Sequence, residues 1–576
     1  MRILFLTHSF NSLSQRLFVE LSLRGHEVSI EFDINDALAE QAVALFKPDL
    51  IVAPFLKRAI PESLWSRQRC LIVHPGIKGD RGPSSLDWAI LRGETRWGVT
   101  VLEANAELDG GDIWASVEFP LRAASKGSLY RNEVAEAALA AVLAALARIE
   151  QGARAEPLNY ADPSVRGRWH NSITQADRAI DWLRDDTARV LRKIRSADGM
   201  PGLRDRIGVR DYYLYNAHPE GELRGEPGGL LAQRDGAICR ATVDGALWIT
   251  HLRPVEPQAG EFAFKLPALR VLGDAAATLP EAPLTVADQP HYPTWQEIRY
   301  REANGVGYLH FDCYNGALDS EQCLRLRDAV RFAQRRPVKV LVLLGGSDFW
   351  CNGIHLNQIE AADSASDESW RNINAMNDLC LALIENSAQY VIAAMAGNAG
   401  AGGVFMALAA DQLWARDGVV LNPHYKGMGN LYGSEYWTYL LPKRVGAAQA
   451  ARLTHNRLPL SAAEAAAQGL LERVIGGDLA AFRQRVTELA ETIAVDAAID
   501  ARLERKRATR AADEQTKPLA AYRAEELERM KLNFYGFDPS YHVARYHFVE
   551  KLPKARTPAY LAHHRRLGAP RAVVAD

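Results

Sequence analysis

A histidine followed by glycines and a later aspartate are the first residues whose types suggest chemistry. His74 opens the segment His74-Pro-Gly-Ile-Lys-Gly-Asp-Arg-Gly-Pro83, and Asp109 stands in Leu108-Asp-Gly-Gly-Asp112. An imidazole can stabilise an oxygen that gains negative charge, and a carboxylate beside it can hold the ring and relay protons. The pair therefore suits attack on an amide-like carbonyl. Taken singly, each could equally be a turn.

Two further glycine-bearing segments lie far along the chain, at Gly346–His355 and Gly397–Gly403. Glycines allow a backbone to approach a ligand closely and to direct its N–H groups inward. Beyond them, Tyr425 and Glu435 lie in the aromatic segment Pro-His-Tyr-Lys-Gly-Met-Gly-Asn-Leu-Tyr-Gly-Ser-Glu-Tyr-Trp. A carboxylate shielded by aromatic side chains acquires a raised pKa and can act as a base. For Tyr425 a packing role, and for Glu435 a surface ion pair, are the alternatives.

Alternating strands and helices must position both regions. Short apolar runs predict strands at 2–6, 28–32, 50–53 and 70–73, with helices between them, for example over 36–46. This alternation indicates a parallel sheet, and His74 then follows a strand at the carboxyl edge, where such sheets bind ligands. An alanine-rich helix is expected over 128–151, a helical stretch over 172–200 and short strands over 207–275. From 305 the strand–helix alternation resumes, and beyond 480 the chain is helical.

The composition argues against several classes of function. The chain has 576 residues, too many for one hydrophobic core, and a net charge of −2. That charge gives no general attraction to nucleic acid or to an anionic membrane, and we expect neither as a partner. The cysteines show no metal-site spacing, so we expect no metal and a reducing, cytoplasmic environment.

The first region resembles formyltransferases that use 10-formyltetrahydrofolate, which carry Asn-x-His-Pro at a strand end and a downstream Leu-Asp-x-Gly. The resemblance implies His74 as the stabiliser of the carbonyl oxygen, Asp109 as its partner, and Asn11 and Ser84 as folate-binding residues. The family's asparagine corresponds to Ile72 here. Losing one such donor costs about 100- to 1,000-fold in rate. Either another group such as Asn11 substitutes, or the acceptor is an easier nucleophile such as a thiol.

The second region resembles the enoyl-CoA hydratase (crotonase) family, in which two backbone N–H groups hold a thioester carbonyl. The resemblance implies the N–H groups of Ile354 and Gly402 as this oxyanion hole. Hydratases place two glutamates nearby for acid–base work, but this chain has Phe405 at the first position and His424 after Pro423 at the second. We therefore expect no hydratase activity, with Tyr425 and Glu435 as the catalytic side chains instead.

Together, the two regions resemble the HypX/HoxX-type maturation factors of nickel–iron hydrogenases. The resemblance implies an α/β protein with four parts: a formyltransferase-type open parallel sheet that binds folate (1–160), a small helix plus β-rich linker module (161–290), a crotonase fold that binds coenzyme A (291–490) and a helical, aromatic tail (491–576). It also implies carbon monoxide synthesis from 10-formyltetrahydrofolate and coenzyme A, with hydrogenase assembly proteins as partners.

Two other functions remain open at this point: an amine formyltransferase fused to an acyl-CoA isomerase, and a non-catalytic scaffold that binds coenzyme A. The aromatic residues over 530–560 are expected to pack on the crotonase core, or alternatively to cap a passage between the two sites.

Overall fold

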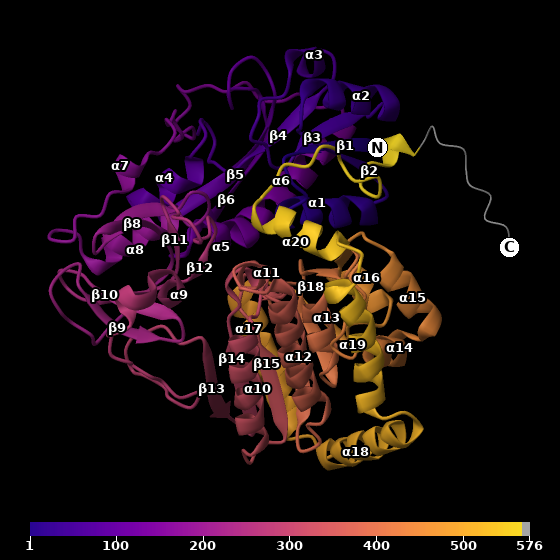
Figure 1. Cartoon of the computed structure of the whole chain (residues 1–576). Helices are drawn as coiled ribbons and strands as arrows, with labels where there is room; N and C mark the ends of the chain where they lie inside the picture. The colour runs from indigo at the N-terminus through magenta and orange to yellow at the C-terminus, as the bar shows by residue number, and fades with distance from the viewer. Residues whose placement is uncertain (567–576) are drawn as a thin grey trace. The chain divides into compact units, whose positions relative to one another are not determined.

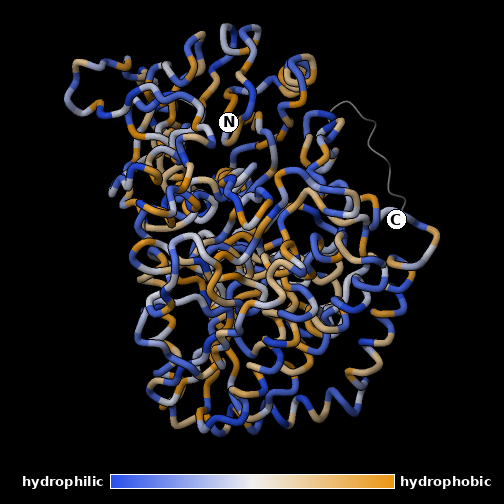
Figure 2. Tube along the Cα trace, turned by 60° about the vertical axis from the view of Figure 1, so that its left-hand side comes forward, coloured by the Kyte–Doolittle hydropathy of each residue, from blue (hydrophilic) through white to orange (hydrophobic). Residues whose placement is uncertain are grey.

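The computed structural model describes residues 1–566, which fall into two compact units (Figure 1). The first unit comprises Met1–Asp181, Ala188–Asp205 and the chain from Pro553 onward; the second comprises Trp182–Thr187 and Arg206–Leu552. Hydrophobic and hydrophilic residues alternate over short stretches of the chain (Figure 2). Within residues 1–566, no helix combines the length and apolar character that a membrane span requires.

A six-stranded sheet forms the centre of the first unit, in the order β2-β1-β3-β4-β5-β6. Its strands are β1 (Arg2–Thr7), β2 (Glu27–Phe32), β3 (Leu50–Ala53), β4 (Cys70–His74), β5 (Arg96–Glu103) and β6 (Ile113–Pro120). The first four run parallel, as the alternation of apolar runs predicts, whereas β5 and β6 are antiparallel additions. Since His74 ends β4, it lies at the carboxyl edge of the parallel strands.

The helices of this unit show where the sequence pattern holds and where it does not. They are α1 (Ser12–Leu23), α2 (Asp36–Phe46), α3 (Glu62–Trp65), α4 (Ser85–Arg92), α5 (Lys126–Arg131), α6 (Glu133–Glu150) and α7 (Gln175–Arg178). The single helix expected over 128–151 is two helices, because Asn132 leaves helical geometry. The prediction of a helical stretch over 172–200 is wrong for about half of its length, because only α7 and α8 (Thr187–Ser196) form there. At the end of α7, the buried Arg178 pairs with Asp87.

The described end of the chain completes the first unit. Thr557 donates a hydrogen bond to Glu31 on β2 at 2.5 Å, and His564 lies 2.9 Å from the other oxygen of the same carboxylate. Glu31 and His564 are both fully buried, and Arg565 also pairs with Glu31. A buried carboxylate with three partners ties the segment after Pro553 to the edge strand of the sheet.

An antiparallel sheet opens the second unit, in the order β8-β11-β10-β9, with β12 paired to β11. Its strands are β8 (Arg210–Glu220), β9 (Leu230–Arg234), β10 (Ala237–Ala241), β11 (Ala246–Pro254) and β12 (Leu266–Pro267), and β7 (Leu203–Ile207) precedes them. The helix α9 (Ala268–Leu272) and the short helix η1 (Gly273–Ala276) follow. The expected β-rich module is therefore present.

The rest of the second unit is built on two further sheets. The larger has the order β13-β14-β15-β17-β19-β22 and the smaller β16-β18-β20-β21. The strands are β13 (Ile298–Ala303), β14 (Val306–Phe311), β15 (Val340–Leu344), β16 (Phe349–Cys351), β17 (Tyr390–Met395), β18 (Asn398–Gly400), β19 (Gln412–Arg416), β20 (Val420–Asn422), β21 (Leu460–Ser461) and β22 (Arg473–Ile475). Both sheets contribute buried residues to one large hydrophobic core.

Helices cover these sheets, and Figure 1 shows α10 and α12 side by side. They are η2 (Tyr314–Gly316), α10 (Ser320–Gln334), α11 (Leu356–Glu360), α12 (Ala365–Ile384), α13 (Gly402–Leu408), α14 (Trp437–Val445), α15 (Ala447–His455), α16 (Ala462–Ala467), α17 (Leu479–Ala494), α18 (Ile499–Thr516), α19 (Leu519–Tyr535) and α20 (Ser540–Val549). Met530, Phe534 and Tyr541 of the tail lie in the large core, so the first part of the expected aromatic segment packs on it.

Candidate functional site

The first candidate site surrounds the His74 ring, which is almost completely buried. Its Nε2 atom lies 2.8 Å from Asp80 Oδ2, and its Nδ1 atom lies 3.6 Å from Asp109 Oδ1. Two carboxylates therefore flank one imidazole, and Asp80 is the closer of the two. Burial opposes protonation of the ring, but the hydrogen bond to Asp80 and the charges of both aspartates outweigh it, so the pKa of His74 is raised.

Asp80 belongs to the segment that drew attention in the sequence, yet sequence reasoning assigned it no role. Its contact with His74 depends on Gly76, because a Cβ atom at that position would collide with both side chains. The second oxygen of Asp80 is buried without a hydrogen-bond partner in residues 1–566 and lies 3.5 Å from His170 Nε2. That oxygen can accept a hydrogen bond from a bound group.

The other residues predicted for this site have structural contacts of their own. Asn11 caps α1 by accepting the Ser14 N–H at 3.0 Å, and its side-chain nitrogen makes no hydrogen bond to the described residues. The Ser84 hydroxyl accepts the N–H of Ile173 at 3.1 Å. Asp109 accepts the Gly82 N–H at 3.2 Å, which orients its carboxylate. The folate-binding roles of Asn11 and Ser84 stay predictions.

The second candidate site lies in the second unit, where two glycine-bearing turns approach each other. Gly353 precedes Ile354 with φ +94°, a conformation that glycine adopts readily, and Gly402 begins α13. A Cβ atom on Gly353 would lie 3.4 Å from the nitrogen of Gly402. The structure thus brings together the two segments whose N–H groups, at Ile354 and Gly402, are predicted to hold a carbonyl oxygen.

Tyr425 and Glu435 meet beside this pair of turns. The Tyr425 hydroxyl lies 2.5 Å from Glu435 Oε2, and a Cβ atom on Gly402 would collide with the same carboxylate. Burial raises the pKa of Glu435 to about 7; the hydrogen bond from Tyr425 opposes the rise, and the charge of Glu526 adds to it. A carboxyl group with such a pKa can gain and lose a proton near neutral pH.

Comparison with known proteins places both sites in one family. A hydrogenase maturation factor HoxX from Bradyrhizobium diazoefficiens is 54% identical over 99% of this chain and 98% of its own length. The chain belongs to the HypX/HoxX family of hydrogenase maturation factors. A crystal structure of HypX from Aquifex aeolicus in complex with tetrahydrofolic acid matches 99% of the chain at 48% identity, with a TM-score of 0.95.

Family models match three parts of this HypX/HoxX-type chain. The formyl transferase model matches residues 27–146, the formyl transferase C-terminal domain model matches 172–261, and the enoyl-CoA hydratase/isomerase model matches 302–555. A methionyl-tRNA formyltransferase from Dechloromonas aromatica is 26% identical over 40% of the chain. The β-rich module expected as a linker therefore matches the formyl transferase C-terminal domain, and the chain joins formyl transferase-type domains to a crotonase-like domain.

Two residues of the crotonase-like domain depart from hydratase chemistry. Phe405 is fully buried and stacks on Tyr425, with ring centres 5.2 Å apart. Neither ring nitrogen of His424 has a hydrogen-bond partner in residues 1–566, and burial lowers its pKa to about 4. A hydrocarbon ring and an imidazole that stays neutral therefore lie at the two positions where the resemblance predicts the acid–base glutamates of a hydratase.

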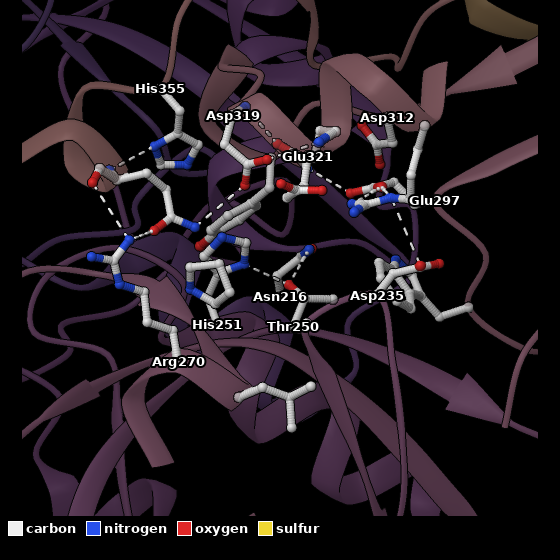
Figure 3. Close-up of a pocket in the computed structure, with 18 residues that line it drawn as sticks. Asn216, Asp235, Thr250, His251, Arg270, Glu297, Asp312, Asp319, Glu321 and His355 are labelled. Carbon is white, nitrogen blue, oxygen red and sulfur yellow. Dashed lines mark hydrogen bonds and ion pairs between the residues drawn. The ribbon is translucent and has the colours of Figure 1, made fainter. Parts of the chain in front are cut away.

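A separate cavity of about 290 Å³ lies between the β8–β11 sheet and the start of α10 (Figure 3). Polar contacts join several of its lining residues: Arg325 forms an ion pair with Glu297 at 2.6 Å, and Gln358 donates a hydrogen bond to Asp319 at 3.3 Å. His355, which follows Ile354, also lines it, whereas Tyr425 and Glu435 do not. This cavity is therefore distinct from the predicted acyl site, although it borders the same loop.

Proposed function

We propose that this protein makes carbon monoxide for hydrogenase maturation in two steps, on two sites. The formyl group of 10-formyltetrahydrofolate is first transferred to the thiol of coenzyme A, and the resulting formyl thioester then loses carbon monoxide. The buried Tyr425–Glu435 pair beside Gly402, in a chain whose hydratase glutamates are absent, is the observation that carries the proposal. The folate complex of the Aquifex aeolicus HypX supports the choice of formyl donor.

In the first step His74 stabilises the formyl oxygen while the thiol sulfur attacks the formyl carbon. The bond from carbon to the folate nitrogen breaks, a carbon–sulfur bond forms, and the thiol proton passes to the nitrogen. Asp80 holds the His74 ring through Nε2, and the charges of Asp80 and Asp109 favour the protonated ring, whose Nδ1–H then donates to the developing oxyanion. A thiol acceptor reduces the demand on the donor that Ile72 cannot supply.

In the second step Glu435 accepts the formyl proton as the carbon–sulfur bond breaks. Carbon monoxide leaves, and the thiolate regains a proton, so the products are carbon monoxide and free coenzyme A. The N–H groups of Ile354 and Gly402 position the carbonyl, because little charge accumulates on its oxygen in this reaction. Tyr425 orients the Glu435 carboxylate or returns the proton to sulfur.

The direct test is to incubate purified protein with 10-formyltetrahydrofolate and coenzyme A and to detect carbon monoxide with a haem probe. Carbon monoxide that appears only when both substrates are present supports the proposal. A stable formylated amine without carbon monoxide would instead favour an amine formyltransferase fused to an isomerase. Absence of any turnover by the purified protein would favour a non-catalytic scaffold.

Crotonyl-CoA hydration by the wild-type protein is expected to stay near background. Phe405 cannot exchange a proton, and water addition needs two acid–base groups. The Phe405→Glu variant should remain inactive because the second glutamate is also missing. Loss of the absorbance of the conjugated thioester measures the reaction, and robust hydration by the wild type would overturn the assignment at Phe405 and His424.

Asp80→Asn is expected to lower formyl transfer by about 100-fold, since it removes the charge that orients and protonates His74. The pKa of His74 should fall, so the loss of transfer as the pH rises should begin at a lower pH than in the wild type. The measurement is the release of tetrahydrofolate against pH. Asp49→Asn, at an exposed aspartate of the same unit, is the matched control. An unchanged pH profile in Asp80→Asn would exclude this role.

A further inference from the structure

A second buried carboxylate, Glu526 on α19, lies next to the turn that carries Glu435. Glu526 is fully buried, and its carboxylate accepts hydrogen bonds from Tyr436 N at 2.9 Å, Thr438 N at 2.8 Å and the Thr438 hydroxyl at 2.5 Å. The Ser434 hydroxyl lies 3.3 Å from the same carboxylate. Every one of these donors belongs to the segment around Glu435.

Glu526 acts as the N-terminal cap of α14 from outside that helix. Tyr436, the residue at the cap position of α14, provides no side-chain cap. The N–H groups at a helix start need acceptors, and a carboxylate also interacts favourably with the helix dipole. The α19 helix packs on α12 and α14 (Figure 1), so a tail element supplies the missing cap.

The capped turn has a conformation that side chains rarely adopt. Glu435 and Tyr436 have φ values of +62° and +59°, in the left-handed region that favours glycine. Asn377 on α12 accepts the Glu435 N–H at 2.7 Å, and Glu526 accepts the N–H of the next residue. These two acceptors, one on α12 and one on α19, hold the backbone that directs Glu435 towards Gly402.

The charges of Glu435 and Glu526 oppose each other in a buried setting. Burial raises the pKa of each carboxyl group to about 7, and the charge of Glu526 contributes to this rise at Glu435. No cation among the described residues offsets the repulsion between these two carboxylates. Arg523 on α19 pairs with Asp378, and no ion pair within residues 1–566 includes Glu526. The other titratable groups whose charges interact with either carboxylate have raised pKa values and stay neutral near pH 7; they are Tyr425, Tyr432, Cys323 and Cys380.

We infer that Glu526 is a positioning residue of the acyl site: it holds the turn that carries Glu435 and places a second buried carboxylate beside that turn. The tail helix α19 is thus part of the acyl site, although none of its atoms needs to touch the substrate. Only the measurement of carbon monoxide release rests on the proposed function. The protonation of Glu435 can be measured without substrate and therefore tests the inference independently.

The test compares wild type, Glu526→Gln and Glu528→Gln, the last at an exposed glutamate of the same helix. Infrared spectra titrate the protonated carboxyl groups, with Glu435→Gln identifying the Glu435 band. In Glu526→Gln the Glu435 midpoint is expected to move about one pH unit lower. The initial rate of carbon monoxide release should then rise at a lower pH, with a plateau reduced by up to about 100-fold because the turn is less well held. Glu528→Gln should match the wild type.

Several outcomes would overturn the inference. An unmoved Glu435 midpoint with a lower plateau would mean that Glu526 supports the fold only, and an unmoved midpoint with an unmoved plateau would mean that it has no role. If wild-type protein releases no carbon monoxide, the proposed function fails, and the infrared titration still decides the coupling of the two carboxyl groups.

Glu526→Asp covers the case in which Glu526→Gln does not fold, as judged by circular dichroism. Aspartate keeps the charge but shortens the reach to Tyr436 and Thr438. The plateau is expected to fall while the midpoint stays near the wild-type value. An Asp variant with an unchanged plateau would contradict the positioning role.

Discussion

His74→Ala is expected to abolish carbon monoxide release from 10-formyltetrahydrofolate and coenzyme A, with a loss of about 1,000-fold or more. The substitution removes the imidazole that lies between Asp80 and Asp109, and with it the proposed donor to the formyl oxygen. Asp109→Ala should reduce the rate by a comparable factor if this carboxylate orients the ring. Carbon monoxide yield from saturating substrates is the measurement.

Formyl-CoA supplied directly provides the control for His74→Ala. The variant leaves the second site intact, so it should still bind coenzyme A and release carbon monoxide from the preformed thioester at the wild-type rate. If His74→Ala releases no carbon monoxide either from 10-formyltetrahydrofolate with coenzyme A or from formyl-CoA, the variant has a folding defect rather than a defect in formyl transfer. Wild-type rates from 10-formyltetrahydrofolate would show that the first site is misassigned.

The elements that were predicted accurately are those whose formation depends on residues close in the sequence. The helix over 36–46 and the strand over 50–53 have the bounds that the sequence predicts, because an Asn35 cap and short apolar runs define them locally. The stretch over 172–200 was predicted wrongly as helical because long-range contacts decide it. Arg178 pairs with Asp87, and the Arg240 guanidinium stacks 3.9 Å above the Trp182 ring.

For the candidate sites too, the sequence predicts residues within local motifs but not long-range contacts. Sequence motifs predicted His74, Asp109 and the glycine turns, because these residues have fixed spacings within the families that they resemble. Asp80 was missed although it lies in the quoted segment, since its contact with His74 depends on the path of a loop with left-handed glycines at Gly79 and Gly82. Nothing in the sequence around Glu526 indicates its contacts with Tyr436 and Thr438, which arise only from the packing of α19.

Glu435→Gln is expected to separate the two reactions: formyl transfer should continue at the wild-type rate, and carbon monoxide release should fall by about 100- to 10,000-fold. The amide is nearly isosteric with the carboxylate and can still accept a hydrogen bond from Tyr425, so the turn should keep its conformation. It cannot accept the formyl proton. Formyl-CoA, or formate from its hydrolysis, should therefore accumulate, and chromatography of the thioesters measures it.

Tyr425→Phe provides the graded comparison, because it deletes one hydroxyl group and retains the ring that stacks on Phe405. A smaller loss is expected, since Glu435 keeps its charge and its place beside Gly402 but loses the 2.5 Å hydrogen bond that orients it. That bond also lowers the pKa of Glu435, so the pH at which carbon monoxide release reaches half its maximum should rise in Tyr425→Phe.

An unchanged carbon monoxide yield from Glu435→Gln, with 10-formyltetrahydrofolate and coenzyme A saturating, would mean that another group is the base. His424, whose ring nitrogens have no partner in residues 1–566, would then be the next residue to replace.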